Sequence, residues 1–196
     1  MTMLVLCTAF LLGSIPFAQI LLRRRGLDLR QVGSGNVGAA NLLRVSSVRL
    51  ALAALALDAA KGSLAVWIAR ELPGAPMLPA WAGLAAIAGH VYPPWLGFRG
   101  GKGMATTGGV FLMLTPVAAL GATIAFVAGV AASRYVSFGS LCAMVALPSL
   151  TWAQAASREY LWVACAASAL VAFRHRSNMR RLLDGSERRL GQKVGA

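Results

Sequence analysis

Apolar residues occur in six long blocks along the chain, and nearly all charged residues lie between these blocks. The blocks cover residues 2–22, 49–69, 78–95, 104–132, 135–153 and 159–173. A transmembrane helix needs about 20 mostly apolar residues, a length that several of these blocks supply. The pattern therefore predicts an all-α fold, a polytopic membrane helical bundle that forms one integral membrane domain over residues 1–196.

The fourth block, residues 104–132, is too long for one straight span and short for two. Pro116 lies near its middle, and a proline removes a helix hydrogen bond and clashes with the preceding turn. A single crossing gives six spans, whereas a fold-back at Thr115-Pro116 gives seven. In the second case residues 104–114 form a short broken helix, which spans about half of the bilayer at about 1.5 Å per residue.

The positions of the 19 lysine and arginine residues separate these two models. Basic residues accumulate in the cytoplasmic loops of membrane proteins. With seven spans, 16 of them lie in cytoplasmic segments, Lys61 lies within a span, and only Arg70 and Arg158 lie outside. With six spans, Arg134 and the basic C-terminal tail are exported. We therefore predict seven spans, including the short broken helix, with the N-terminus outside and the C-terminus cytoplasmic.

The first block is predicted to remain as an uncleaved span. No basic residue precedes it, and Arg23, Arg24 and Arg25 follow it directly, unlike the arrangement in a cleaved signal peptide.

Basic residues in cytoplasmic loops account for the net charge of +13. Nucleic-acid binding is not needed to explain it, and the sequence contains no RNA-binding or DNA-binding module. Cys7, Cys142 and Cys165 lie in apolar blocks without metal-binding spacing, so we expect them to be packing residues. The sequence has neither paired histidines nor a carboxylate-rich cluster, and no metal site or cofactor is predicted.

Four polar stretches stand out from the apolar blocks. The first, VGSGNVGAANLLR at 32–44, has the glycine spacing of a dinucleotide fingerprint, but a basic loop replaces the strand which that motif requires. Its glycines permit tight curvature, and Ser34, Asn36 and Asn41 offer neutral donors. The stretch favours an anion-binding nest, with an ordinary glycine–asparagine turn as the alternative.

The second stretch is GHVYPPWLGFRGGKGMATTGG at 89–109. It is not a P-loop, because Leu96 stands where that motif has its first glycine and Gly103 stands where it has a serine or threonine. Its glycines expose backbone amides and Lys102 adds a positive charge. The positive end of the half-helix that begins near Met104 points to the same place, where Thr106 adds a hydroxyl. We predict a site for a phosphate-like anion at the membrane surface; a basic cytoplasmic turn is the alternative.

The third stretch is DAAKG, in which Asp58 and Lys61 share one face of an apolar span. Ionisable residues at such a depth usually face a polar cavity. A pair spaced i,i+3 can also satisfy itself, and Asp58 can then orient Lys61 toward a site.

The fourth stretch, RHRSNMRRLLDGSERR at 174–189, is typical of a basic amphipathic segment on anionic lipid. Its His175 and Asn178 share one face, which can turn toward the bundle. His90 lies 12 residues before Lys102 and beside prolines at the end of a span, so these two side chains can meet.

The stretches GSGNVGAANLLR, GHVYPPWLGFRGGKGMAT and RHRSNMRRLLDGSE together resemble the bacterial acyl-phosphate:glycerol-3-phosphate acyltransferase family, PlsY. GSIPFAQ, DAAKG and RYVSFGS support the resemblance, which covers about residues 11 to 189. It implies a seven-helix enzyme of phospholipid synthesis in the bacterial cytoplasmic (inner) membrane, with its active site facing the cytoplasm. The implied reaction transfers a fatty acyl group from acyl phosphate to the 1-hydroxyl of glycerol 3-phosphate, gives lysophosphatidic acid and phosphate, and needs no metal.

The resemblance also assigns residues to the site. We expect catalytic roles for His90 and Lys102. Substrate-binding roles are implied for Ser34, Asn36, Asn41, Arg44, Lys61, Gly100, Gly101, Gly103, Thr106, Arg134, Ser137, His175, Asn178 and Arg181. Two positions depart from the family pattern: Ala40, where threonine is frequent, and Arg99, where lysine is usual.

The predicted mechanism is direct attack of the glycerol hydroxyl on the acyl carbonyl, without an acyl-enzyme, because acyl phosphate is already activated. The proton passes either to His90 or to the donor phosphate. The first alternative function is a membrane transporter for phosphate-type anions, since transporters also use broken helices. The second is a lipid-binding scaffold, which leaves both glycine loops unexplained. Acyl chain-length preference, binding order and oligomeric state stay open.

Overall fold

A computed structural model gives an all-helical bundle and describes residues 1–23, 26–73 and 76–192. In chain order the elements are α1 (Thr2–Gly13), α2 (Phe17–Arg23), α3 (Ala39–Val45), α4 (Val48–Arg70), α5 (Leu78–Val91), η1 (Pro94–Leu96), α6 (Met104–Leu114), α7 (Pro116–Ser133), α8 (Val136–Ala153), α9 (Arg158–Arg174) and α10 (Arg176–Leu183). Arg24, Arg25 and Lys193, which entered the charge argument, lie outside the described residues.

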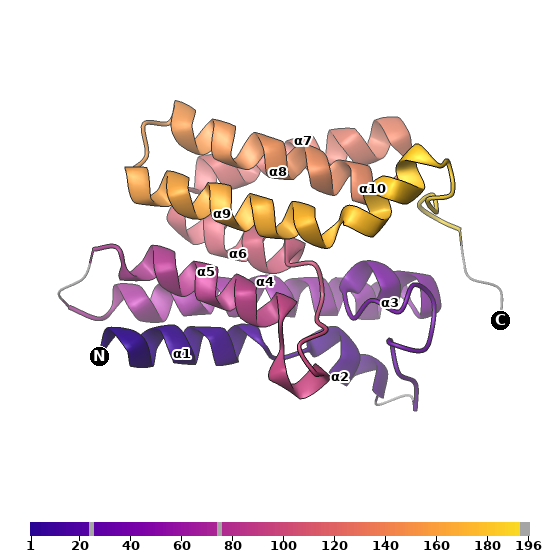
Figure 1. The fold of residues 1–196 in the computed structure, drawn as a ribbon, viewed down its shortest axis with the longest axis horizontal. Helices are drawn as coiled ribbons and strands as arrows, with labels where there is room; N and C mark the ends of the chain where they lie inside the picture. Colours follow the sequence, from indigo (N-terminus) through magenta and orange to yellow (C-terminus); the bar gives the residue numbers. More distant parts are fainter. Residues whose placement is uncertain (24–25, 74–75, 193–196) are drawn as a thin grey trace.

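The short helix α6 lies at the centre of the bundle. Figure 1 shows α1, α4 and α5 on one side of α6, and α7, α8 and α9 on the other. Helix α6 contacts α4, α5, α7 and α9. Because neighbouring helices surround it, a helix too short to cross a membrane is covered by protein, as a broken helix at membrane depth requires.

The predicted break at Thr115-Pro116 is confirmed. Helix α6 ends at Leu114 after 11 residues, and Pro116 is the first residue of α7, where a missing amide hydrogen has no cost to the helix. The last carbonyls of α6 have no partner within the helix, and the Arg70 Nη2 atom donates a hydrogen bond to the Met113 carbonyl. The end of α4 therefore caps the turn at which the chain reverses.

The first apolar block was predicted as one span but consists of two helices. Helix α1 ends at Gly13, and α2 begins at Phe17. Pro16 lies between them and cannot supply the amide hydrogen that a continuous helix would need there. The interruption leaves the Ile15 carbonyl available to a partner from another helix.

Four helical segments in the described part of the chain are long and apolar enough to cross a membrane: Thr2–Arg23, Val48–Arg70, Pro116–Ser133 and Val136–Ala153. The blocks predicted at 78–95 and 159–173 form the shorter α5 and α9. Helix α5 stops at Val91 because Pro93 and Pro94 follow, and a residue before proline is disfavoured in helical geometry.

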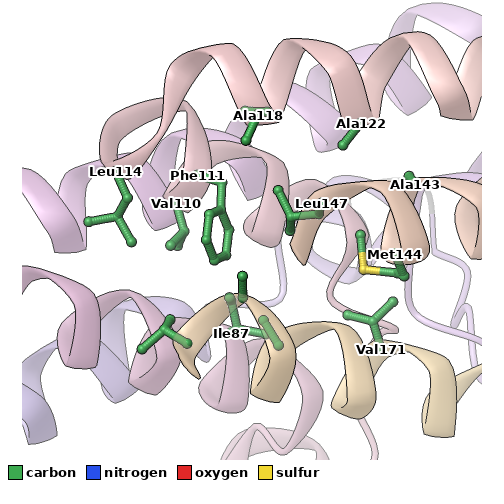
Figure 2. Close-up of a cluster of buried hydrophobic side chains, with 14 of the residues drawn as sticks. Ile87, Val110, Phe111, Leu114, Ala118, Ala122, Ala143, Met144, Leu147 and Val171 are labelled. Atoms are coloured by element: carbon green, nitrogen blue, oxygen red, sulfur yellow. The ribbon is translucent and has the colours of Figure 1, made fainter. Parts of the chain in front are cut away.

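The largest buried cluster joins the two sides of the bundle through α6. Figure 2 shows Phe111 of α6 between Val110 and Leu147, with Ile87 of α5 close by. Helices α4 and α6 approach closely because Gly62 and Gly109 present no side chain at their contact; a Cβ atom on Gly62 would lie 2.5 Å from the Thr106 carbonyl oxygen. Small residues at such contacts are the usual means of close helix packing in membrane proteins.

Figure 1 also shows that α2, α3 and α10 lie at the same end of the bundle, opposite to the N-terminus. The loop between α5 and α6 and the turn between α7 and α8 open toward this end. The polar stretches are thereby placed around one common region.

Candidate active site

A pocket of about 130 Å³ lies between α3, α6, α8 and α10. It is lined by residues from all the polar stretches identified in the sequence. The predicted site residues that line it are Ser34, Asn36, Asn41, Arg44, His90, Lys102, Gly103, Ser137, His175 and Asn178. The remaining ones, Lys61, Gly100, Gly101, Thr106, Arg134 and Arg181, lie outside its lining.

Lys102 connects the second polar stretch to the fourth. Its Nζ atom donates a hydrogen bond to Asn178 Oδ1 at 2.5 Å. Burial, only partly opposed by the attraction of the Glu187 carboxylate, lowers the pKa of Lys102 to about 8, and the Arg181 and Arg44 guanidinium groups act in the same direction. An incoming anion would relieve this crowding of positive charge.

Glu187 is a member of the site that the sequence analysis did not assign. Its side chain is buried, and its carboxylate accepts hydrogen bonds from Ser137 Oγ at 3.0 Å, Asn178 Nδ2 at 2.7 Å and Arg181 Nε at 2.7 Å. Although burial raises it, the hydrogen bonds from Asn178 and Arg181 hold the pKa of Glu187 below its ordinary value. The signal in the sequence was a rare acidic residue inside the basic stretch RRLLDGSERR.

Arg181 and Arg134 act at the edge of the pocket rather than in its lining. Arg181 is bound to the Glu187 carboxylate. The Arg134 carbonyl accepts a hydrogen bond from the Leu190 amide at 2.7 Å, which fastens the segment after α10 to the turn between α7 and α8. Both residues therefore hold the segment that closes the pocket, and their direct contact with substrate stays a prediction.

The first polar stretch is shaped by Asn41. Its Nδ2 group donates to the carbonyls of Leu29, Val32 and Asn36, while its Oδ1 atom accepts from the Ser34 amide. These contacts use both amide hydrogens of Asn41 to hold the loop, and its predicted contact with substrate stays a prediction. Arg44, in the last turn of α3, makes no hydrogen bond or ion pair with another described residue, and its guanidinium group is available to an anion.

The glycine loop presents fewer free amides than predicted. The Gly100 amide donates to the Val91 carbonyl at 3.0 Å, and the Gly101 amide donates to the His90 carbonyl at 3.2 Å. Both amides dock the loop on the end of α5, and a contact of Gly100 or Gly101 with substrate stays a prediction. Gly103, with a φ of 88°, is the residue just before α6, and the first turn of this helix opens into the pocket at Met104.

The sequence analysis also placed the positive end of α6 at the predicted anion site. The first-turn amides have no acceptor within their own helix, and the helix dipole places positive potential at the same point. Thr106, in contrast, is completely buried where α6 meets α4. Its Oγ1 atom has no hydrogen-bond partner among the described residues, and its contact with substrate stays a prediction.

Lys61 also lies outside the pocket lining. Its Nζ atom lies 2.7 Å from Asp58 Oδ1 and donates to the Ile15 carbonyl at 2.7 Å. The interpretation of the pair as self-satisfied agrees with these contacts, which engage the ammonium group, and the contact of Lys61 with substrate stays a prediction.

The two histidines differ in their surroundings. The His90 Nδ1 atom lies 3.5 Å from Asp58 Oδ1, and its Nε2 atom packs beneath Gly101. The His175 Nδ1 atom is 2.8 Å from the Val171 carbonyl, and burial lowers the pKa of His175 to about 4. His175 is therefore neutral at pH 7.

In the described residues, no group of three or more His, Cys, Asp or Glu side chains has the arrangement of a metal site. The positive charge in the pocket comes from Arg44, Lys102 and the α6 terminus, and the carboxylates of Asp58 and Glu187 also line it. Such an arrangement suits an anionic ligand.

The lowered pKa of Lys102 predicts a pH dependence. A lysine with a pKa of about 8 is protonated below that pH and loses its charge above it. We expect kcat/KM to fall above about pH 8, approaching tenfold per pH unit, because kcat/KM reports the free enzyme. Any activity left in Lys102→Arg should lack this fall, since a guanidinium stays charged. A wild-type profile flat to pH 10 would contradict the assignment.

Comparisons with known proteins agree with this geometry. Residues 3–185 match the family model described as glycerol-3-phosphate acyltransferase. The chain is 42% identical to a glycerol-3-phosphate acyltransferase of Anaeromyxobacter sp. (strain Fw109-5), with 96% of each chain covered. It is 45% identical to one of Myxococcus xanthus (strain DK1622), with 96% of this chain and all of the relative covered.

Two crystal structures of PlsY (YgiH), an integral membrane glycerol 3-phosphate acyltransferase, have the same fold. The glycerol 3-phosphate form has a TM-score of 0.93 at 36% identity, covering 97% of this chain and 96% of that one. The lysophosphatidic acid form has a TM-score of 0.91 at 34% identity, covering 97% and 95%.

Proposed function

The chain belongs to the glycerol-3-phosphate acyltransferase family, and from this premise we propose that it transfers a fatty acyl group from acyl phosphate to the 1-hydroxyl of glycerol 3-phosphate. The products are lysophosphatidic acid and phosphate. Both substrates carry a phosphate, and the donor also carries an apolar tail. The site must therefore hold anionic groups beside a long hydrocarbon chain.

The observation that carries the proposal is the continuity of the cationic pocket with an apolar groove. A groove of about 410 Å³ runs between α6, α7 and α8. Leu55, Met104, Ala105 and Phe126 line both the groove and the polar pocket. An acyl phosphate fits this shape, with its phosphate among the cations and its tail along the groove.

We assign the two phosphates to the positive groups that stay available. Arg44, Lys102 and the first-turn amides of α6 surround the pocket, and Ser34 and Asn36 add polar side chains from the opposite wall. Positive groups at fixed positions stabilise the charge that develops on the acyl oxygen and on the leaving phosphate. Holding the hydroxyl beside the carbonyl supplies the remainder of the effect.

Direct transfer is favoured over an acyl-enzyme. Cys7, Cys142 and Cys165 do not line the pocket. Ser137, which does, donates its hydrogen bond to Glu187 and has no histidine partner among the described contacts. A covalent acyl-protein adduct, trapped by rapid quenching and mass spectrometry, would contradict direct transfer.

The proton of the hydroxyl then passes to the donor phosphate. His90 lines the pocket, but its Nε2 atom faces Gly101 and its Nδ1 atom faces Asp58, so the chain occupies the space beside both ring nitrogens. His175 lines the pocket, but a pKa of about 4 makes it a weak proton acceptor. The phosphate of the donor is close to the reacting hydroxyl in any productive arrangement.

We also propose seven crossings of the bacterial cytoplasmic membrane, with the N-terminus outside and the pocket facing the cytoplasm. The placement of α2, α3 and α10 at the end opposite to the N-terminus supports this orientation (Figure 1). Basic residues favour the cytoplasmic side. A cysteine placed at Gly185 should react with a membrane-impermeant thiol reagent only from the cytoplasmic face. Labelling of intact cells from outside would overturn the orientation.

The direct test of function uses the purified protein in detergent or lipid with glycerol 3-phosphate. Acyl phosphate, acyl-CoA and acyl carrier protein loaded with the same acyl chain are supplied separately. We expect phosphate release and lysophosphatidic acid formation with acyl phosphate alone. Turnover with acyl-CoA or acyl carrier protein at a comparable rate would contradict the proposed donor.

Gly108 gives a test of the groove. It lines the groove, and a side chain added there would meet no atom within 4 Å, so leucine can project into the path of the tail without moving the helices. We expect Gly108→Leu to lower kcat/KM for a long-chain acyl phosphate by about tenfold more than for a short-chain one. Ile124→Phe is the matched control, because Ile124 is 70% exposed on α7 outside the groove. An equal loss for both chain lengths would contradict the assignment.

A further inference from the structure

A buried ionic cluster lies at the wall of the active-site pocket, where α4, α5 and the break between α1 and α2 meet. Asp58 and Lys61 of α4 are buried, and so is His90 of α5. Asp58 Oδ1 lies 2.7 Å from Lys61 Nζ and 3.5 Å from His90 Nδ1. Buried charges are costly in a membrane-embedded bundle, so an arrangement of this kind calls for a function.

The cluster fastens the break between α1 and α2. Lys61 Nζ donates to the Ile15 carbonyl at this break. Trp95 Nε1, from the loop after α5, donates to Ser14 Oγ at 2.7 Å. The loop that leads to the glycines is thereby docked against the interrupted first block.

His90 connects the cluster to the glycine loop. Its carbonyl accepts the Gly101 amide, and its ring fills the space in which a Gly101 side chain would lie. Lys102 is the next residue, and α6 begins two residues later. The position of the His90 ring therefore sets where the Lys102 backbone and the positive end of α6 are held.

We propose that Asp58 is a positioning residue for acyl transfer, which acts through His90 on the loop that carries Lys102. This inference rests on the proposed function. The Asp58 carboxylate lies 3.5 Å from the imidazole Nδ1 atom and limits where the ring can sit, and the imidazole supports Gly101 from below. Lys61 neutralises Asp58 and ties it to the Ile15 carbonyl. A displacement of about 1 Å in a positioned charge can cost about 100-fold in rate.

The test separates positioning from the simple neutralisation of a buried charge. In Asp58→Leu/Lys61→Met both charges are removed together, and replacing a buried ion pair by apolar residues is often neutral or stabilising. We expect a melting temperature in detergent close to that of the wild type. We expect kcat to fall by about 10- to 100-fold, with the KM values for glycerol 3-phosphate and acyl phosphate within about threefold, because the pocket cations are still present.

His90→Leu completes the experiment, since it leaves the Asp58–Lys61 pair intact. It should lower kcat as much as the double variant does. The triple variant, which combines all three substitutions, should show no further loss, because the effects of residues that act through one contact do not add. A kcat within about twofold of the wild type in a folded double variant would overturn the proposal, and so would multiplicative losses in the triple variant. If the double variant fails to fold, His90→Leu decides, and full kcat in that variant overturns it.

Leu64→Ala serves as the matched control on α4, because Leu64 is exposed on the lipid side. Wild-type turnover with acyl phosphate is measured in every series. If the wild type does not turn over acyl phosphate, the proposed function is contradicted. If the wild type and the folded double variant turn it over equally well, only the positioning role of Asp58 is contradicted.

Discussion

Replacing Lys102 with alanine is expected to lower kcat by at least about 100-fold, the scale on which a preorganised charge-stabilising donor contributes to catalysis. Lys102 is the cation that projects from the loop before α6 into the pocket, where it contacts Asn178. Charge develops on the acyl oxygen and the leaving phosphate during transfer, and the ammonium group stabilises that charge more than it stabilises the bound substrates.

Lys102→Arg should recover only part of the activity, because a planar guanidinium fork does not occupy the space of a compact ammonium group. Arg99→Ala is the matched control. It removes one positive charge from the same loop, but Arg99 is exposed and lies outside the pocket lining. We expect Arg99→Ala within about twofold of the wild type. Steady-state kinetics with acyl phosphate and glycerol 3-phosphate make the comparison, and a Lys102→Ala enzyme within threefold of the wild type would refute the role.

The second large effect is expected for Glu187→Ala. The substitution leaves Ser137, Asn178 and Arg181 without their common acceptor and removes the negative charge that faces Lys102. Removing one partner of a buried, hydrogen-bonded charge is strongly destabilising. We expect kcat/KM to fall by about 100-fold and the melting temperature in detergent to fall with it, as the positive groups around the pocket spread apart.

Asp184→Ala is the control for Glu187, since Asp184 is an exposed acid just after α10, outside the pocket. Its kinetics and melting temperature should match those of the wild type. A Glu187→Ala enzyme with unchanged kcat and a lower KM for glycerol 3-phosphate would contradict this role. Glu187 would then only occupy the place of a substrate phosphate and would not hold Ser137, Asn178 and Arg181 in position.

Several features of the site followed from local sequence. Lys102, Arg44 and Asn178 lie in stretches whose glycine and basic residues predicted an anion site, and all three line one pocket. Glu187 was missed because its importance depends on partners as distant as Ser137, 50 residues earlier in the chain. No pattern within a single helix or loop reports a contact of that range.

Other residues assigned to the site make hydrogen bonds within the fold. The amides of Gly100 and Gly101 are bound to carbonyls of α5, and the Asn41 amide is bound to carbonyls of its own loop. Lys61 bonds to a carbonyl 46 residues earlier. A donor on a glycine-rich or polar stretch is visible in the sequence, but whether it faces the chain or a ligand depends on which segments pack against it.

The sequence alone determined the class of the protein, the apolar segments, the reversal at Thr115-Pro116 and the stretches that carry its chemistry. Hydropathy, proline and charge placement act through the local chain and the solvent around it, so they can be interpreted without a fold. The tertiary structure alone decided which polar groups enter the pocket, that Pro16 divides the first block, and that Asp58 and His90 lie behind the glycine loop. These outcomes depend on the packing of helices that are distant in the chain, and a local pattern does not specify that packing.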